Sequence, residues 1–217
     1  MKCMLTFSFR IIIAALMFGL SSGAAQDLKP IQLPQPQTEG GRPLMQALKE
    51  RKTTRVFSTE KLPPQTLSNL LWAAFGVNRS SGQRTAPSAV NWQEIDLYVA
   101  LADGMFLYDA KANTLQPVLG QDIRAATGTQ ALVKDAPVSL VYVADLDKPG
   151  KVPESEKELW SAMDVGFIAQ NVYLFAASEG LACQVRALID RPALAKLLNL
   201  RPKQKILLAQ SVGHVKK

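Results

Sequence analysis

The chain is poor in cysteine and histidine: it has two cysteines, Cys3 and Cys183, and one histidine, His214. Cys3 lies in a predicted N-terminal leader, so removal of that leader leaves one thiol and no internal disulfide. Cys183 is predicted to be a small buried residue of a strand, because a catalytic thiol, the alternative, needs a histidine partner. His214 is predicted to be a surface or packed residue, not a ligand. A serine hydrolase is not indicated either, since no Gly-x-Ser-x-Gly motif follows residue 25.

Aromatic residues make up only 7% of the chain, and its cationic residues are not gathered into a run. The formal net charge is +7, and removal of the leader takes away Lys2 and Arg10 and no acidic residue, which leaves +5. Nucleic-acid binding therefore has little support. An anionic cofactor would account for part of the excess. The remaining composition, 47% hydrophobic and 20% charged, is that of one globular domain.

The N-terminus has the organisation of a secretory signal peptide. Lys2 and Arg10 precede ten apolar residues, 11–20, and small residues occupy 21–25. We expect residues 1–25 to be a cleaved leader and the protein to be periplasmic or secreted, without a membrane span after cleavage. A retained anchor helix is the alternative, but ten apolar residues are short for a span. Residues 26–42, rich in Pro, Gln and Gly, are predicted to form an extended arm outside the core.

The most distinctive stretch is residues 164–181, which contain no charge between Val165 and Ser178. Apolar residues at steps of three and four predict a helix that ends at Gly180. Because the helix is apolar nearly all round, we expect it to be the central helix of the core or to lie at a dimer interface.

The other elements alternate unevenly along the chain. Short apolar or alternating runs predict strands at 95–101, 105–108, 138–144, 181–186 and 205–213, with a hairpin turn at Asp103-Gly104. The run 138–144 is nearly continuous and is predicted to be an internal strand. Helices are predicted from Pro43, over 63–76 and 192–198, and over 122–134 with a break near Gly128. This order indicates an α+β fold with a mixed or antiparallel sheet.

Two polar segments are candidates for binding. In the stretch 51–57, extended backbone would place Arg51, Thr53 and Arg55 on one face, where two guanidiniums and a hydroxyl suit a phosphate. A solvated basic turn would show the same residues. In the loop 78–93, Pro87 fixes the backbone and several amide and hydroxyl side chains follow it, as in a binding loop or a plain surface connection.

Several stretches together resemble the FMN-dependent nitroreductase family. The family's pattern Arg-x-Ser/Thr-x-Arg followed by an aromatic residue is similar to residues 51–57, and its Pro-Ser-x-x-Asn-x-Gln loop is similar to residues 87–93. Its central helix, with an Asp-x-Gly start, a Gln-Asn pair and a Gly-Leu exit, resembles residues 164–181. The hairpin segment 97–109 resembles more specifically the branch that includes the thiazole- and oxazole-forming dehydrogenases. The resemblance runs from about residue 44 to 213.

The resemblance implies a nitroreductase-like domain over residues 43–217, an α+β sandwich built around the long helix and stable as a homodimer, with FMN bound where two subunits meet. It assigns the FMN phosphate and ribityl chain to Arg51, Lys52, Thr53 and Arg55. It assigns contacts with the flavin to Ser88, Ala89 and Asn91, a backbone N–H near flavin N5 to Ala187 and Leu188, and a terminal cation to Lys216 or Lys217. It implies no catalytic side chain and no metal ligand.

The activity implied is ping-pong hydride transfer through flavin N5, from a reduced small-molecule donor to a nitroaromatic, quinone or related acceptor. Two departures bear on this. Residues 186–188 read Arg-Ala-Leu where the family often has Gly or Glu-Gly, and little chain follows Gly213. The alternative function is a non-catalytic flavin-fold binding or scaffold protein of the cell envelope.

Overall fold

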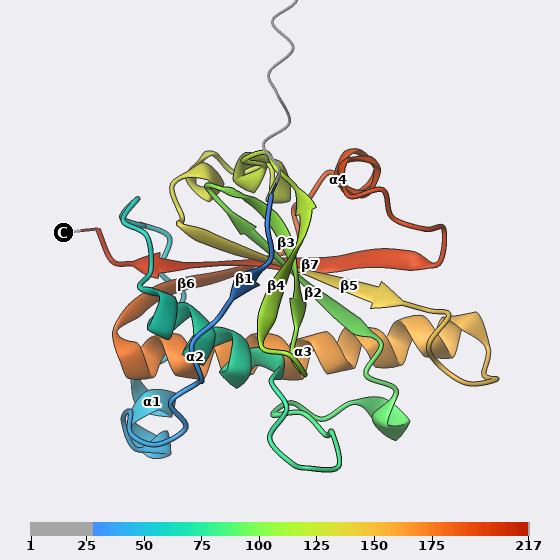
Figure 1. Ribbon diagram of the computed structural model, residues 1–217, viewed down its shortest axis with the longest axis horizontal. Helices are drawn as coiled ribbons and strands as arrows, with labels where there is room; N and C mark the ends of the chain where they lie inside the picture. Colours follow the sequence, from blue (N-terminus) through green and yellow to red (C-terminus); the bar gives the residue numbers. More distant parts are fainter. Residues whose placement is uncertain (1–27, 217) are drawn as a thin grey trace, which may run out of the picture.

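The computed structural model of the protein describes residues 28–216, so the predicted leader and Lys217 lie outside the described residues. Within residues 28–216, seven strands form one sheet in the order β1-β4-β3-β2-β5-β7-β6 (Figure 1), and every neighbouring pair is antiparallel. The strands are β1 (Ile31–Gln32), β2 (Ile95–Leu101), β3 (Gly104–Asp109), β4 (Thr114–Leu119), β5 (Val138–Asp145), β6 (Leu181–Arg186) and β7 (Gln204–His214). The α+β prediction is confirmed, and of the two sheet types left open the antiparallel one is correct.

Helices cover both faces of this sheet. The helices are α1 (Leu44–Glu50), α2 (Pro64–Phe75), α3 (Glu154–Glu179) and α4 (Arg191–Leu197). Figure 1 shows α1, α2 and α3 on one side of the sheet and α4 on the other, where two 3₁₀ turns also lie, η2 (Arg124–Thr127) and η3 (Ala131–Lys134). The larger hydrophobic cluster packs between the sheet and α2 and α3, and a smaller one packs beneath α4.

Strand β5 forms the middle of the core. It pairs with β2 on one side and β7 on the other, and all eight of its residues are buried. A strand covered on both faces must be apolar at successive positions, not at alternate ones. The prediction of an internal strand from the apolar run 138–144 is therefore confirmed.

Helix α3 is the longest element, with 26 residues. Glu154 and Glu156 lie in its first turn, where the helix dipole favours acidic side chains. Gly180 ends it in the left-handed conformation, with φ of 70°, which glycine adopts without steric cost. The buried side of the helix, toward the sheet, includes Val165, Ile168, Val172 and Ala176. The opposite side carries a stripe of exposed apolar residues at steps of four: Leu159, Met163 and Phe167.

Three segments differ from the sequence-based predictions. Strand β4 was not predicted. It contains Pro117, which the ladder tolerates beside a shift in register between β3 and β4 that forms a bulge. The arm is extended, but β1 pairs with β4 and Leu33 is buried, so placing the arm outside the core is wrong at Leu33. The segment 122–134 forms two 3₁₀ turns on either side of Gly128, not a helix with a break.

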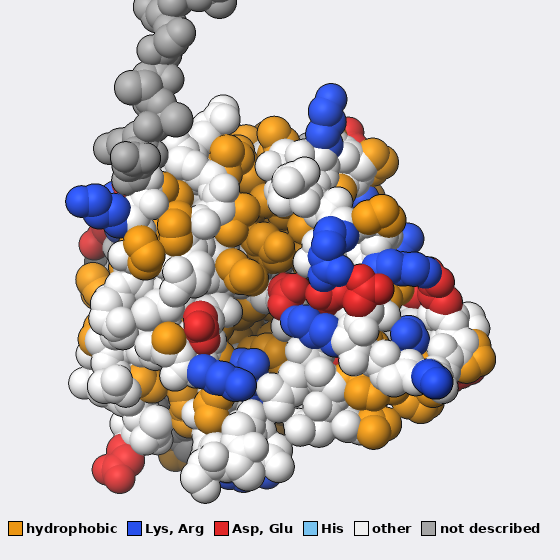
Figure 2. All heavy atoms as spheres, turned by 45° about the vertical axis from the view of Figure 1, so that its right-hand side comes forward, with side chains coloured by type: hydrophobic (Ala, Val, Ile, Leu, Met, Phe, Trp, Pro, Cys, Tyr) orange, Lys and Arg blue, Asp and Glu red, His pale blue; other side chains and the backbone are white. Residues whose placement is uncertain are grey.

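The end of the molecule where β5 leads toward α3 carries interleaved charges. Figure 2 shows acidic and basic side chains side by side on this face, and the ion pairs there are Arg201 with Asp145 and Asp147, Lys203 with Glu154, and Lys148 with Asp96. Among residues 28–216 the structure has no helix with the length and apolar character that crossing a membrane requires.

Candidate functional site

Residues 51–57, called the strap here, cross the outer edge of the sheet. β6 is the last strand of the sheet, so one of its edges has no neighbouring strand. The strap occupies part of this edge: the N–H of Thr54 donates to the carbonyl oxygen of Cys183 at 2.9 Å. At its far end Phe57 forms an isolated bridge with Val215. The predicted switch to extended chain is confirmed, although the strap pairs only at these points.

Tyr173 of α3 holds the strap and β6 together. Its hydroxyl lies 3.0 Å from Thr53 Oγ1 and accepts a hydrogen bond of 3.0 Å from the N–H of Val185. The Arg51 guanidinium lies over the Tyr173 ring, with Cζ 5.3 Å from the ring centroid. The sequence placed Tyr173 only on an apolar helix face. A phenol in that face was the available signal, because a buried hydroxyl needs a partner.

The backbone that follows β6 lies beside the strap. Ala187 and Leu188 are exposed, and within the described part of the chain neither of their N–H groups donates a hydrogen bond. The Leu188 carbonyl accepts from the N–H of Thr129 at 3.1 Å, which fixes the peptide. Lys216 lies near the other end of the strap, with its N 3.5 Å from the Val56 carbonyl oxygen. The structure thus gathers the candidates of residues 51–55, 187–188 and 216 along one sheet edge.

Arg186, the last residue of β6, turns its side chain away from this edge. It is buried, and its guanidinium donates to the Thr127 carbonyl at 2.8 Å and to Ser211 Oγ at 3.1 Å. No carboxylate among the described residues forms an ion pair with it, and burial lowers the pKa of Arg186 to about 10. Arg186 therefore supports the 127–128 turn beneath residues 187–188.

The second group of candidates lies in the loop 87–93. The N–H of Ala89 donates to Asp164 Oδ2 at 2.8 Å, and the N–H of Gln93 donates to Ser88 Oγ at 2.8 Å. Trp92 of this loop stacks on Trp160 of α3 with ring centroids 5.0 Å apart. Non-glycine residues with positive φ in this loop are Val90, Asn91 and Gln93. Such backbone persists only where surrounding contacts hold it, and strain of this kind is common in binding loops.

Glu94, which directly follows the loop, is a buried carboxyl group that sequence analysis did not single out. It is fully buried and accepts from Ser88 Oγ at 3.3 Å, while its other oxygen has no partner among the described residues. Burial raises the pKa of Glu94, and the nearby Asp164 carboxylate adds to the rise. Asn91, in contrast, is exposed and its Oδ1 accepts from Gln93 Nε2.

The two groups contact different parts of α3. Asp164 holds the loop and Tyr173 holds the strap, and the step of nine residues from one to the other corresponds to about 13.5 Å along a helix. A cavity of about 430 Å³ lies beside Ser88 and Ala89 and is bounded by Met163 and Phe167. One chain therefore presents the two groups as separate halves.

The thiol of Cys183 takes no part in either group. It is buried in β6, as predicted, and accepts a hydrogen bond from Gln210 Nε2 at 3.1 Å. Burial raises the pKa of Cys183 to about 12, so the thiol stays protonated at neutral pH. His214 pairs with Leu181 at the far end of the β6–β7 ladder, so it does not face the thiol as a base would.

Comparison with known proteins agrees with the fold and with the motifs. The model of the nitroreductase family matches residues 48–214. A protein of Methanocaldococcus jannaschii named as a candidate nitroreductase is 30% identical over 148 residues, which are 64% of this chain and 75% of that protein. The crystal structure of a candidate nitroreductase from Ralstonia eutropha has a TM-score of 0.84 and 40% identity, over 89% of this chain and 92% of that chain.

A candidate nitroreductase from Desulfovibrio desulfuricans, solved in complex with FMN, has a TM-score of 0.59 and 22% identity, over 82% of this chain and 89% of that chain. At this level of identity the likeness concerns the fold. The family match covers well over half of the sequence and includes the strap, the 87–93 loop and the central helix. This chain belongs to the nitroreductase family.

Proposed function

We propose that this protein is an FMN-dependent oxidoreductase that acts as a homodimer and transfers hydride by a ping-pong mechanism. The observation that carries the proposal is the edge of β6, where the strap lies beside two backbone N–H groups without partners. The strap offers two guanidiniums and a hydroxyl, and residues 187–188 offer two neutral donors. Such a donor set suits an anionic cofactor that also has a planar hydrogen-bonding ring.

The residues present fit FMN in their chemistry. Arg51 and Arg55 match a phosphate in charge and geometry, and Thr53 is already oriented by its contact with the Tyr173 hydroxyl. The exposed N–H groups of Ala187 and Leu188 are free to donate to a flavin ring. Lys52 and Lys216 add positive charge near the strap. When bound, FMN supplies hydride chemistry at N5, and these residues bind and orient it.

The separation of the two groups on α3 supports the homodimer. We propose that Ser88, Ala89 and Asn91 of one chain contact the flavin that the strap of a second chain binds. The apolar stripe of α3 offers the surface for that chain: Met163 is 53% exposed and Phe167 is 48% exposed. Other exposed apolar residues lie on α1, which packs against α3. Large apolar patches of this kind mark protein interfaces.

The finer assignments rest on the sequence. We propose a nitroaromatic, a quinone or a related acceptor, a small-molecule reduced donor, and a position in the branch resembling the thiazole- and oxazole-forming dehydrogenases. We also propose that residues 1–25 are a cleaved leader that directs the protein to the periplasm or outside the cell. N-terminal sequencing of the protein recovered from the producing cells tests the leader: a chain beginning near residue 26 supports it, and an intact Met1 contradicts it.

A visible absorption spectrum of the purified protein, with identification of the chromophore released by heat, tests the cofactor. Near one FMN per chain, reduced by a chemical donor and reoxidised by a quinone, is the expected result. Protein that is colourless and takes up no added FMN would contradict the proposal. Bound FMN that no donor reduces would favour the non-catalytic alternative.

Two pairs of variants test the site and the dimer. Arg51→Ala removes a charged donor, which is worth about 1.5–3 kcal/mol, so FMN affinity should fall roughly tenfold or more, whereas Arg79→Ala, outside both groups, should not change it. Phe167→Asp places a charge in the apolar stripe and should give monomers in analytical ultracentrifugation. Val118→Asp alters an exposed apolar residue on β4 and should leave the dimer intact.

A further inference from the structure

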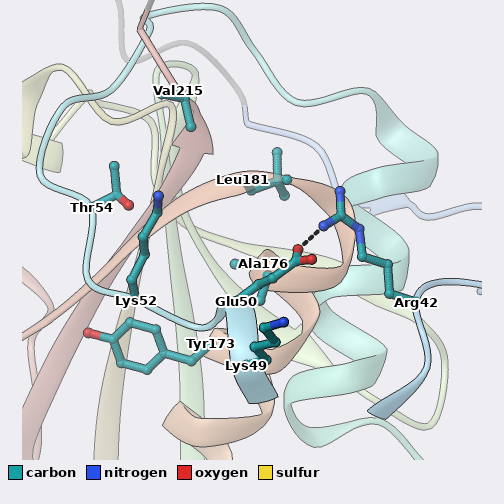
Figure 3. Close-up of a pocket in the computed structure, with 11 residues that line it drawn as sticks. Arg42, Lys49, Glu50, Lys52, Thr54, Tyr173, Ala176, Leu181 and Val215 are labelled. Carbon is teal, nitrogen blue, oxygen red and sulfur yellow. Dashed lines mark hydrogen bonds and ion pairs between the residues drawn. The ribbon is translucent and has the colours of Figure 1, made fainter. Parts of the chain in front are cut away.

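A second cavity, of about 490 Å³, lies beside the strap. Figure 3 shows it between the end of α1, the strap and the C-terminal part of α3. Lys52 and Thr54 line it, whereas Arg51, Thr53 and Arg55 do not. In extended backbone successive side chains point to opposite sides, so the strap turns Arg51, Thr53 and Arg55 away from this cavity. Lys52, which the resemblance also assigns to FMN, and Tyr173, which contacts Thr53, both line it. The volume is within the range typical of small-molecule sites.

The wall of this cavity carries a net positive charge. Its one lining carboxylate, Glu50, is paired with Arg42 (Figure 3). Glu50 also accepts a hydrogen bond of 2.9 Å from Gln46 Nε2. The cavity has two lining ammonium groups, on Lys49 and Lys52, and neither forms an ion pair within residues 28–216. Two positive charges thus remain for an external anion.

Besides the polar residues Thr54 and Tyr173, most of the remaining lining is apolar and rests on fixed elements. Ala176 and Ala177 of α3, Leu181 of β6 and Val215 contribute aliphatic surface. Arg42 is held at the rim because its backbone N–H donates to Ser178 Oγ at 2.9 Å and its side chain pairs with Glu50. The rim is therefore positioned by the end of the arm, and the floor by the end of α3.

From these observations we propose that this cavity binds an amphipathic organic anion, with an acidic head group at Lys49 and an apolar body over Ala177 and Leu181. In this proposal the organic anion and FMN occupy opposite sides of the strap. A purely inorganic anion would leave the apolar floor exposed to water, and a neutral apolar ligand would leave the Lys49 ammonium group unused.

Calorimetric titration of the purified protein, with the flavin that it contains, tests the site with three probes: octanoate, octan-1-ol and inorganic phosphate. One octanoate per chain is the expected result, with affinity at least tenfold above that of either other probe and lower at high salt. Octan-1-ol binding as tightly as octanoate would overturn the charged half of the proposal, and phosphate binding as tightly would overturn the apolar half.

Two variants locate the bound probe. Lys49→Met should lower octanoate affinity roughly threefold to fivefold, the effect of one exposed ion pair, while Lys196→Met on α4 should not change it. Ala177→Phe fills the floor and should abolish binding. Unchanged octanoate affinity in Lys49→Met or in folded Ala177→Phe would overturn the proposal. So would octanoate that displaces FMN or binds only to flavin-free protein, since the cavity would then be part of the flavin site.

Discussion

Gly128 lies against the guanidinium of Arg186, and replacing it with alanine makes a sharp test of this part of the structure. A Cβ at this position would come closer to Arg186 Nη1 than two non-bonded atoms can lie, and 3.2 Å from Val133 Cγ2. A long side chain usually moves aside at little cost. Arg186 is buried, however, and its guanidinium is held by Thr127, Ser139 and Ser211, so it cannot move without breaking those contacts.

The magnitude follows from two contributions. Overpacking a buried site costs about 1–3 kcal/mol. Displacing the guanidinium also weakens its charged hydrogen bond with the Thr127 carbonyl, and such bonds are worth about 1.5–3 kcal/mol. Alanine restricts the unfolded chain, which returns about 0.4–1 kcal/mol. The net effect expected for Gly128→Ala is a free energy of unfolding lower by about 1.5–5.5 kcal/mol.

Urea denaturation followed by circular dichroism measures this difference. The matched control is Gly150→Ala, because a Cβ at Gly150 meets no atom within 4 Å. The control should stay within about 0.5 kcal/mol of the original protein. If Gly128→Ala is as stable as Gly150→Ala, the Arg186 side chain is not fixed as described, and the support that it gives to residues 187–188 is refuted.

Three further predictions concern buried polar groups. Asp164→Ala removes the acceptor of the Ala89 N–H, so it should lower the free energy of unfolding by about 1.5–3 kcal/mol and should also lower FMN uptake. Asp109→Ala, at the end of β3, removes the acceptor of the Lys111 N–H and is the control: it should lower stability less and leave FMN uptake unchanged. Cys183 keeps its proton in the folded state to a pKa of about 12, whereas the unfolded thiol ionises near 9.0. The free energy of unfolding should therefore fall as pH rises between these two values. In Cys183→Ala this fall should be shallower by up to about 1.4 kcal/mol per pH unit, measured by urea denaturation at several pH values. Equal slopes of the free energy of unfolding against pH in the two proteins would contradict this prediction. Burial raises the pKa of Glu94 above its usual 4.5, so the unfolded state releases this proton first as pH rises. Glu94→Gln should gain stability relative to the original protein as pH rises above 4.5, and a constant difference between the two from pH 4 to 8 would rule out the raised pKa.

Local patterns in the sequence determined the central helix and the internal strand. The helix shows apolar residues at steps of three and four around Phe167 and a stop at Gly180. The strand shows an unbroken apolar run from Val138. Each pattern is a property of a single segment and can be recognised without knowledge of the segments that pack against it. The motifs likewise placed the chain in its family. The strand around Pro117 was missed because its bulge depends on the partner strand β3.

Only the tertiary structure decided how the candidate residues are grouped. The strap lies on β6 because Thr54 meets Cys183, more than a hundred residues later, and Tyr173 joins the strap to Val185. The same helix holds the 87–93 loop about two and a half turns away, at Asp164. Contacts between distant segments decide which face of the strap meets a cavity. They also decide that the carboxyl group of Glu94 is buried. Sequence spacing records helix and strand periods, but those contacts form only when the whole sheet closes.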